Sequence, residues 1–160
     1  MAVRELLLLR HAEAMAVSSD GRDVERPLSL NGETQARAAG TWLASEDARP
    51  DVVLCSPARR AQMTADMVCQ ALCTPPPKLL QEIYQATPGE LLWLLEARAD
   101  RAERVLLVGH NPGLEQLLAF LTEGRSAGAR GMAPAALAWL ELGDEALEPG
   151  RARLRTLWSP

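Results

Sequence analysis

The sequence predicts an α/β fold, with a mostly parallel central sheet that has an antiparallel edge. Short apolar segments alternate along the chain with longer segments in which apolar residues recur at helical spacing, and this alternation is typical of α/β domains. The chain has 160 residues, of which 48% are hydrophobic, so it can bury one adequate core. No internal repeat divides the sequence, and we therefore expect a single domain over residues 1–160.

Three short apolar segments are the expected central strands, because brief runs rich in Leu and Val are typical of parallel strands that are buried on both faces. They are residues 5–9, 52–55 and 105–108. A fourth strand is expected over residues 79–84. Residues 136–142 and 153–158 are also strand-like, and the turn-rich stretch between them, residues 143–150, predicts an antiparallel hairpin at the sheet edge.

Four helices are expected, each preceded by a residue whose side chain can cap a helix N-terminus. These capping residues are Asn31, Ser56, Thr87 and Asn111. A proline directly follows Ser56, Thr87 and Asn111, and proline is favoured at the first helical position. Thr87 and Glu90 also have the spacing of a capping box. Residues 12–28 and 123–134 are expected to be loops, the second of them mobile.

The charge balance and the longest apolar run exclude two classes of partner. The chain has 17 basic and 21 acidic residues, so no sequence-wide basic field can hold a nucleic-acid backbone. The longest apolar run, Leu6–Leu9, is far shorter than the roughly 20 residues of a membrane-spanning helix. The three cysteines are an odd number without a CxxC motif, which indicates a reducing compartment. We expect a cytoplasmic protein that binds neither nucleic acid nor membranes.

Polar residues follow each of the three expected central strands. Arg10 and His11 follow the first, Arg60 lies near the start of the helix after the second, and His110 follows the third. Ligands of parallel sheets bind beyond the carboxyl ends of the strands. Guanidinium groups can grip phosphate oxygens, and an imidazole can act as a nucleophile. The chain has only two histidines, and both lie at strand ends, so we expect a site for a phosphoryl group there.

Four motifs carry a resemblance to a known family. In chain order they are Leu9–Ala14, Arg26–Ser29 followed by Gly32, Ser56–Ala61 and Val108–Pro112. With this order and content, the chain resembles the histidine phosphatase superfamily, whose fold is phosphoglycerate mutase-like, and within it the small SixA-type phosphohistidine phosphatases. The resemblance implies a three-layer α/β/α sandwich, and it covers most of the chain.

The resemblance also implies roles for the residues at the strand ends. His11 is the implied nucleophile, transiently phosphorylated, and Arg10, Arg60 and His110 complete a phosphate pocket. Arg60 is matched rather than Arg59, because the family arginine is the fourth residue after the serine of Ser-Pro. No metal and no organic cofactor is implied. His11 must attack through one ring nitrogen while the other N–H is held, and we expect a backbone carbonyl to hold it.

Three further residues are candidates for the site. Arg26 and Asn111 are candidates for binding substrate, and Glu82, near the end of the fourth expected strand, is the candidate general acid. Larger members of the family carry a long insertion between the second arginine and the second histidine. The segment between Arg60 and His110 is too short for such a helical lid, so we expect an open site that suits a phosphoryl group presented by another protein.

The expected function is therefore a metal-independent phosphatase, in a monomeric protein, that acts on phosphohistidine of a phosphorelay or phosphotransferase protein. Two alternatives stay open: a small-molecule phosphomonoesterase of the same superfamily, and a non-catalytic module that binds phosphoproteins. A cysteine-dependent phosphatase is disfavoured, because it needs five residues between thiolate and arginine, whereas four separate Cys55 from Arg60. We expect Cys55 to be a buried residue at a strand end.

Overall fold

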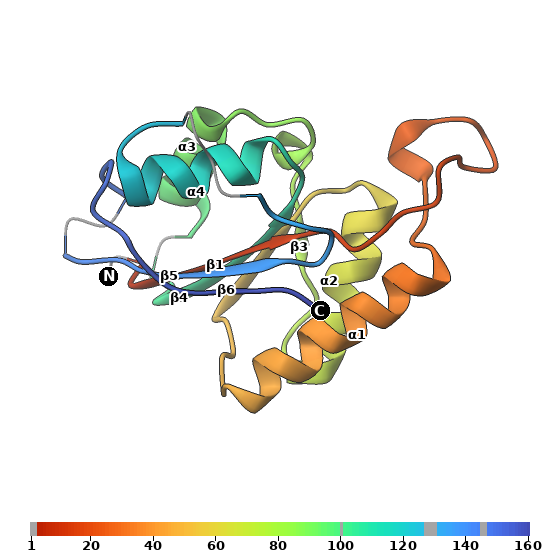
Figure 1. Cartoon of the computed structure of the whole chain (residues 1–160), viewed down its shortest axis with the longest axis horizontal. Helices are drawn as coiled ribbons and strands as arrows, with labels where there is room; N and C mark the ends of the chain where they lie inside the picture. Colours follow the sequence, from red (N-terminus) through yellow and green to blue (C-terminus); the bar gives the residue numbers. More distant parts are fainter. Residues whose placement is uncertain (1–2, 100, 127–130, 145–146) are drawn as a thin grey trace.

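A six-stranded mixed sheet forms the centre of the protein, in a computed structural model that describes residues 3–99, 101–126, 131–144 and 147–160. The strands lie in the order β3-β2-β4-β1-β5-β6, with helices on both faces (Figure 1). They are β1 (Glu5–Arg10), β2 (Val52–Cys55), β3 (Lys78–Leu79), β4 (Arg104–Gly109), β5 (Leu137–Glu141) and β6 (Arg153–Trp158). The expected three-layer α/β/α fold is confirmed.

The central strands are parallel and one edge of the sheet is antiparallel, as predicted. β4 pairs in parallel with both β1 and β2, and β2 pairs in parallel with β3. β5 runs antiparallel to β1, and β6 runs antiparallel to β5. In this order the carboxyl ends of β1 and β4 are neighbours, with Arg10 paired to Gly109.

Two pairs of helices cover the two faces of the sheet, α1 and α2 on one and α3 and α4 on the other (Figure 1). The helices are α1 (Leu30–Ser45), α2 (Arg59–Leu72), α3 (Pro88–Arg98) and α4 (Gly113–Glu123). Side chains of β1 alternate between the two cores: Leu7 and Leu9 face α1 and α2, while Leu6 and Leu8 face α3 and α4. Because both faces are buried, β1 is a continuous apolar run rather than an alternating one.

The predicted helix starts are right in one case of the four. At α3 the capping box is present: the Thr87 hydroxyl accepts from the N–H of Glu90, and the Glu90 carboxylate accepts from the N–H of Thr87. At α1 the prediction is wrong, because Ser29 is the N-cap and accepts from the Gly32 N–H. Asn31 lies inside that helix.

The predicted caps Ser56 and Asn111 are also wrong. α2 begins at Arg59 and α4 at Gly113, so neither following proline is the first helical residue. Instead, the Ser56 hydroxyl lies 2.8 Å from a ring nitrogen of His110, and the Asn111 amide donates to the Glu115 carboxylate at 2.8 Å. The Ser56 hydroxyl also accepts from the Ala58 N–H at 3.2 Å, and the Asn111 amide also donates to the Met132 carbonyl at 2.9 Å, so each side chain combines a local contact with one to a distant segment.

The fourth predicted strand, residues 79–84, is wrong beyond its first residue. The N–H of Leu80 donates to the carbonyl of Cys55, and the chain then leaves the sheet for a 3-10 turn, η2 (Gln81–Ile83). Ile83 is buried against the core of α3 and α4. The turn delivers Tyr84 to the carboxyl ends of the strands, where it lines a pocket.

The loop after β1 is held at its base and contains a short 3-10 turn. Ala14 and Leu28 form an isolated antiparallel bridge, and η1 (Asp23–Glu25) lies between them. Gly32 of α1 packs against this loop so closely that a Cβ atom would lie 2.0 Å from the Glu13 carbonyl oxygen. A glycine is therefore required where α1 meets the loop.

Two predicted loops extend over residues that the structure does not describe. The expected mobile loop 123–134 includes residues 127–130, and the turn-rich stretch 143–150 includes residues 145–146, both of which lie outside the described residues. α4 continues to Glu123 and ends at Gly124, whose φ of +79° suits glycine. In the described part of the chain, the helices are too short or too polar to cross a membrane.

Candidate active site

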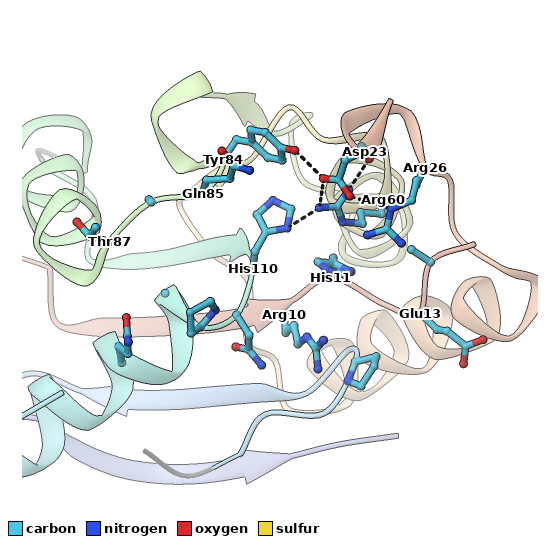
Figure 2. A pocket seen from close by; sticks show the side chains of 17 residues that line it. Arg10, His11, Glu13, Asp23, Arg26, Arg60, Tyr84, Gln85, Thr87 and His110 are labelled. Carbon is cyan, nitrogen blue, oxygen red and sulfur yellow. Dashed lines mark hydrogen bonds and ion pairs between the residues drawn. The ribbon is translucent and has the colours of Figure 1, made fainter. Parts of the chain in front are cut away.

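A pocket of about 760 Å³ lies at the carboxyl ends of β1 and β4 (Figure 2). Both histidines of the chain and three arginines line it: Arg10, His11, Arg26, Arg60 and His110. The topology explains this gathering, since β1 and β4 are neighbouring parallel strands and α2 starts beside them. The predicted convergence of polar residues at the strand ends is thus present.

The two histidines lie next to each other. His11 follows β1 and His110 follows β4, and their rings are 5.1 Å apart between centroids, tilted by 57°. Because the strands are parallel and in register, the residues that follow them lie next to each other at the carboxyl-terminal edge of the sheet. Two imidazoles thereby face one small volume.

A backbone carbonyl orients the ring of His11. Its Nδ1 lies 2.7 Å from the carbonyl oxygen of Ala12, and because a carbonyl only accepts, Nδ1 carries the proton. The other nitrogen, Nε2, is then unprotonated. Ala12 is held in turn, since its N–H donates to the Thr64 hydroxyl at 3.0 Å and that hydroxyl donates to the Arg60 carbonyl at 2.7 Å. The expected backbone carbonyl that holds the His11 N–H is present.

Both imidazoles are neutral at pH 7. Burial lowers the pKa of His11 to about 4, with the cations of Arg60 and Arg10 acting in the same direction. Burial and the neighbouring His11 and Arg60 lower the pKa of His110 to about 3. A neutral imidazole with a free ring nitrogen has the lone pair that a nucleophile needs.

Ser56 and Arg60 hold the ring of His110. The Nε2 atom lies 2.8 Å from the hydroxyl of fully buried Ser56, and Nδ1 lies 3.5 Å from Nη2 of Arg60. A guanidinium donates and never accepts, so Nδ1 is the acceptor and Nε2 carries the proton of His110. The unprotonated Nδ1 therefore faces Arg60.

The arginines of the pocket hold donors that the protein leaves unpaired. Among the described residues, the Nε atoms of Arg10 and Arg60 are buried and lack a hydrogen-bond partner. Nη1 of Arg10 donates to the Met132 carbonyl at 2.9 Å, while the side chain of Arg60 is only 7% exposed. Buried charged donors without a partner are costly, and an anion would satisfy them. The pocket therefore suits a phosphate group.

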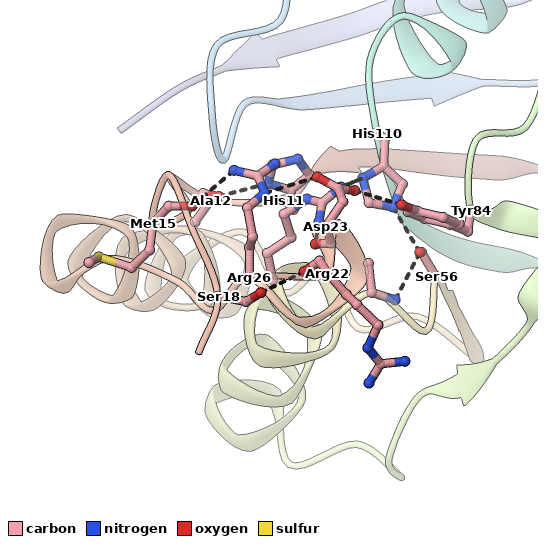
Figure 3. Close-up of polar contacts among 12 residues, drawn as sticks. His11, Ala12, Met15, Ser18, Arg22, Asp23, Arg26, Ser56, Tyr84 and His110 are labelled. Atoms are coloured by element: carbon pink, nitrogen blue, oxygen red, sulfur yellow. Dashed lines mark hydrogen bonds and ion pairs between the residues drawn. The ribbon is translucent and has the colours of Figure 1, made fainter. Parts of the chain in front are cut away.

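Asp23 of η1 joins several of these groups (Figure 3). Its carbonyl accepts from Nη1 of Arg60 at 2.9 Å, and its carboxylate accepts from Nη2 of Arg60 at 3.1 Å. The Tyr84 hydroxyl donates to the same carboxylate at 2.6 Å, and Arg26 Nε does so at 2.9 Å. The Tyr84 hydrogen bond, followed by those of the arginines, lowers the pKa of Asp23 to about 2. Asp23 is thus an anion across the physiological pH range.

Arg26 and Asn111 both line the pocket, as their candidacy requires. Arg26 contacts Asp23, and its Nη1 donates to the Met15 carbonyl at 2.9 Å. The Nδ2 atom of Asn111 already donates two hydrogen bonds within the protein, to the Glu115 carboxylate and to the Met132 carbonyl. The Oδ1 atom of Asn111 is buried and has no partner among the described residues.

Glu82 is not brought to the pocket. It lies in η2, half exposed, and its carboxylate is 3.7 Å from the guanidinium of Arg98. This placement corrects the expectation that Glu82 is the general acid, which depended on the strand that η2 replaces. Glu13 lines the pocket, but its carboxylate accepts from Ser29 and Asn31 and points away from the histidines (Figure 2).

Cys55 is buried at the end of β2, as expected. Its side chain is fully enclosed, and burial raises the pKa of its thiol well above the usual range. A thiol in this state is a poor nucleophile at pH 7. The other two cysteines, Cys69 and Cys73, are also free. Among the described residues, no three His, Cys, Asp or Glu side chains are arranged to hold a metal ion.

Sequence reasoning missed the roles of three residues at the site: Asp23 and Tyr84 line the pocket, and Ser56 holds the ring of His110. Ser56 carries a signal, since a serine directly at the end of a central strand lies beside the predicted site, but the same residue also fits a helix cap. Asp23 lies in the 3-10 turn η1, and Tyr84 directly follows the 3-10 turn η2. These connecting segments lack the apolar periodicity by which helices and strands are predicted from sequence.

The sequence matches one family model and a curated relative. The family described as "Histidine phosphatase superfamily (branch 1)" matches residues 6–85. An uncharacterised protein of Mycobacterium tuberculosis, Rv1276c, is 33% identical over 104 residues, which cover 65% of this chain and 63% of that protein. This chain therefore spans less than two thirds of the length of that relative.

Two solved structures share the fold over nearly the whole chain. One, from Agrobacterium tumefaciens, is assigned as a phosphohistidine phosphatase SixA; it is 29% identical, with a TM-score of 0.85 over 100% of both chains. The other is the protein histidine phosphatase SixA complexed with tungstate, which is 25% identical, with a TM-score of 0.84 over 98% of this chain and 97% of that one.

Proposed function

This chain belongs to the histidine phosphatase superfamily, and we propose that it hydrolyses phosphohistidine on a protein through a covalent intermediate on His11. One observation carries the proposal. The Nδ1–H of His11 is bound to the Ala12 carbonyl, so the lone pair of Nε2 is free in a pocket with three arginines. The similarity to the two SixA structures supports phosphohistidine as the substrate.

In the first step, Nε2 of His11 attacks the phosphorus atom of the substrate. A P–N bond to His11 forms while the P–N bond to the substrate imidazole breaks. The guanidinium groups of Arg10 and Arg60 stabilise the charge on the equatorial oxygens in a loose transition state, and His110, which lines the same pocket, accepts from Arg60. Nδ1 keeps its proton and donates it in a hydrogen bond to the Ala12 carbonyl, so the ring of phosphorylated His11 is a cation that pairs with its own phosphoryl group.

In the second step, water attacks the phosphorus atom of phosphorylated His11. The P–N bond breaks, Nε2 regains its lone pair as a neutral imidazole, and orthophosphate and a proton are released. Because the pKa of unphosphorylated His11 in the folded protein is about 4, the regenerated ring is neutral and can attack the next substrate. The reaction as proposed uses only side chains of this protein and water, without a metal.

The leaving group supports phosphohistidine over an alkyl phosphate. Among the described residues of the pocket, the Asp23 carboxylate is an anion, and the Glu13 carboxylate is bound by Ser29 and Asn31 and points away from the histidines (Figure 2). An alkoxide leaves slowly without a general acid. A phosphohistidine that is protonated on its second ring nitrogen leaves as neutral imidazole, so it needs no acid from the protein.

The chain between Arg60 and His110 supports a protein as the carrier of the phosphoryl group. All of its regular elements (α2, β3, η2, α3 and β4) belong to the sheet or to the layers beside it. No helix of this described segment is left over to close the pocket as a lid. A site without a lid suits a phosphoryl group on a macromolecule better than a small metabolite.

The test is a substrate comparison with the purified chain. Phosphate release is measured from a protein phosphorylated on histidine, from a phosphoserine peptide and from a panel of sugar phosphates, all in the presence of EDTA. We expect turnover of the phosphohistidine protein to exceed that of the others and to be unaffected by EDTA. The His11→Asn variant is the matched control, since it keeps a polar side chain but lacks the nucleophile.

Three other results would each change the assignment. A preference for sugar phosphates would indicate a small-molecule phosphomonoesterase that uses the same His11. Binding of the phosphoprotein without turnover of any substrate would indicate a non-catalytic module. Loss of activity in EDTA would contradict the metal-free mechanism.

A further inference from the structure

Asp23 makes more contacts with the cationic side of the pocket than an ordinary loop carboxylate would. Two of its acceptors, the backbone carbonyl and Oδ2, are bound by the two terminal nitrogens of Arg60. Oδ2 also accepts from the Tyr84 hydroxyl, and Oδ1 accepts from Arg26 Nε. One residue of η1 thus connects α2, the chain after η2 and the end of its own loop (Figure 2).

We propose that Asp23 is a positioning residue for phosphoryl transfer, which orients Arg60 toward the phosphoryl group and limits how tightly the pocket holds the phosphate product. This inference rests on the proposed function for its catalytic part. It assigns no contact between Asp23 and the reacting atoms.

The orienting role follows from the geometry of the guanidinium. Contacts to both Nη atoms of Arg60 from one residue fix the plane of the group. With that plane fixed, Nη2 lies 3.5 Å from His110, and the buried Nε–H is left without a partner in the described structure. A donor that is already aimed before the substrate binds costs little reorganisation in the transition state.

The limit on product affinity follows from charge. Arg10, Arg26 and Arg60 line the pocket together, and orthophosphate would bind strongly to three uncompensated cations. The Asp23 carboxylate contacts two of the three, and it is ionised at every pH at which the histidines are neutral. It therefore offsets part of the attraction for the product while its two contacts hold Arg60 at the pocket.

Tyr84 supports Asp23 from the opposite side of the pocket. Its hydroxyl is 2.6 Å from Oδ2, and its ring meets the His110 ring edge-on, with centroids 5.6 Å apart. Tyr84 is thus fixed by His110 at one end and binds Asp23 at the other. Loss of the hydroxyl should loosen Asp23 without a change in charge, so Tyr84→Phe separates the orienting role from the electrostatic one.

The test compares Asp23→Asn, Asp23→Ala and Tyr84→Phe with wild type. For each, kcat and KM are measured on the phosphohistidine protein, together with the inhibition constant of orthophosphate and the melting temperature. Asp20→Asn is the matched control, because Asp20 lies in the same loop and pairs with Arg22 but does not line the pocket.

We expect kcat to fall by up to about 100-fold in Asp23→Ala, as for other losses of alignment, and less in Asp23→Asn, which keeps an acceptor. The orthophosphate inhibition constant should fall about fivefold in both, the change that one unit charge about 4 Å away produces in water. Tyr84→Phe should lower kcat only, and Asp20→Asn should change neither constant.

A fall in kcat together with tighter binding of orthophosphate distinguishes positioning from a structural role, because a damaged pocket would lose both activity and affinity. Wild-type kcat in the folded Asp23→Ala variant would overturn the inference, as would an orthophosphate constant that rises in parallel with the loss of kcat. If wild type does not turn over phosphohistidine, the proposed function fails, and calorimetric titration with orthophosphate still tests the charge effect. Equal orthophosphate affinity in wild type and Asp23→Asn would then overturn it.

Discussion

The Nδ1 atom of His11 is hydrogen-bonded to the carbonyl oxygen of the next residue, Ala12, at 2.7 Å. This contact makes Nε2 the nitrogen that can be phosphorylated. We predict that His11→Ala abolishes phosphate release and still binds the phosphoprotein, because the arginines remain. Quenched reactions of the wild type should contain an acid-labile phosphoenzyme with the phosphoryl group on Nε2, which NMR can distinguish from Nδ1. Full activity of His11→Ala, or phosphate on Nδ1, would contradict the assignment.

Arg60 and Arg59 are adjacent in the sequence but differ in their surroundings. Arg60 is buried and lines the pocket, whereas Arg59 is exposed and does not. Arg60→Ala should lower kcat/KM by about 10²–10³, equivalent to about 3–4 kcal/mol, because a charged donor is lost where charge develops. Arg59→Ala is the control and should stay within about twofold of wild type. Equal losses in the two variants would show that Arg60 acts only through the net charge of the helix start.

The strand ends of the site could be predicted from the sequence, and the physical reason is simple. β1 and β4 are apolar runs that end at Arg10 and Gly109. The sequence alone therefore identifies the residues that follow them as lying at strand ends. Parallel pairing then places His11 and His110 together. The place of Arg60 at the site was expected for a similar reason, since α2 begins a few residues after β2 ends.

The wall of the pocket could not be predicted, because it depends on contacts between distant segments. Tyr84 reaches the pocket only because the chain leaves the sheet after Leu80, whereas its sequence pattern resembles a strand. Asp23 is bound by Arg60 and Tyr84, which lie 37 and 61 residues away in the sequence, so no local pattern links them to it. Ser56 shows the same limit, since its hydroxyl accepts locally from the Ala58 N–H and also contacts His110, a partner that only the tertiary structure reveals.

Glu82 should make no contribution to catalysis, in contrast to the expectation from sequence. Its carboxylate is exposed, pairs with Arg98 and does not line the pocket. We predict that Glu82→Gln changes kcat by less than about twofold and stability by less than about 0.5 kcal/mol, as for other surface ion pairs. The pH profile of kcat is the decisive measurement. Loss of its alkaline limb in Glu82→Gln would restore the general-acid role.

The two histidines should make the protein less stable as the pH falls below neutrality. The pKa of His11 is lowered to about 4 and that of His110 to about 3, whereas both would titrate near 6.5 in the unfolded chain. Between these values the unfolded state binds more protons than the folded state, so the free energy of unfolding decreases as the pH drops from about 6.5 toward about 4. It reaches its full value above pH 6.5.

Urea unfolding at pH 7 and pH 5 measures this effect. The chain has only these two histidines, so the double variant His11→Asn, His110→Asn should lose most of the difference between the two pH values. Asp23, with its pKa lowered to about 2, contributes in the same direction but over a lower pH range, since its stabilisation is lost only as the pH falls from about 3.8 to about 2. An unchanged difference in the double variant would contradict the neutral, buried state of both rings.

Gly32 should be the glycine whose substitution damages the site from a distance. A Cβ atom at Gly32 would lie 2.0 Å from the Glu13 carbonyl oxygen, so Gly32→Ala must push the loop after β1 away from α1. Overpacking of this kind costs about 1–3 kcal/mol, and the displaced loop carries Asp23. We therefore predict a lower melting temperature together with a lower kcat.

Gly89 supplies the matched control, because it also lies in a helix but a Cβ atom there would have no neighbour within 4 Å. Gly89→Ala should raise the free energy of unfolding by up to about 1 kcal/mol, since alanine favours the helix more than glycine does. It should leave kcat unchanged. If Gly32→Ala were as stable and as active as Gly89→Ala, the close approach of α1 to the loop would be wrong, and with it the support that α1 gives to the position of Asp23.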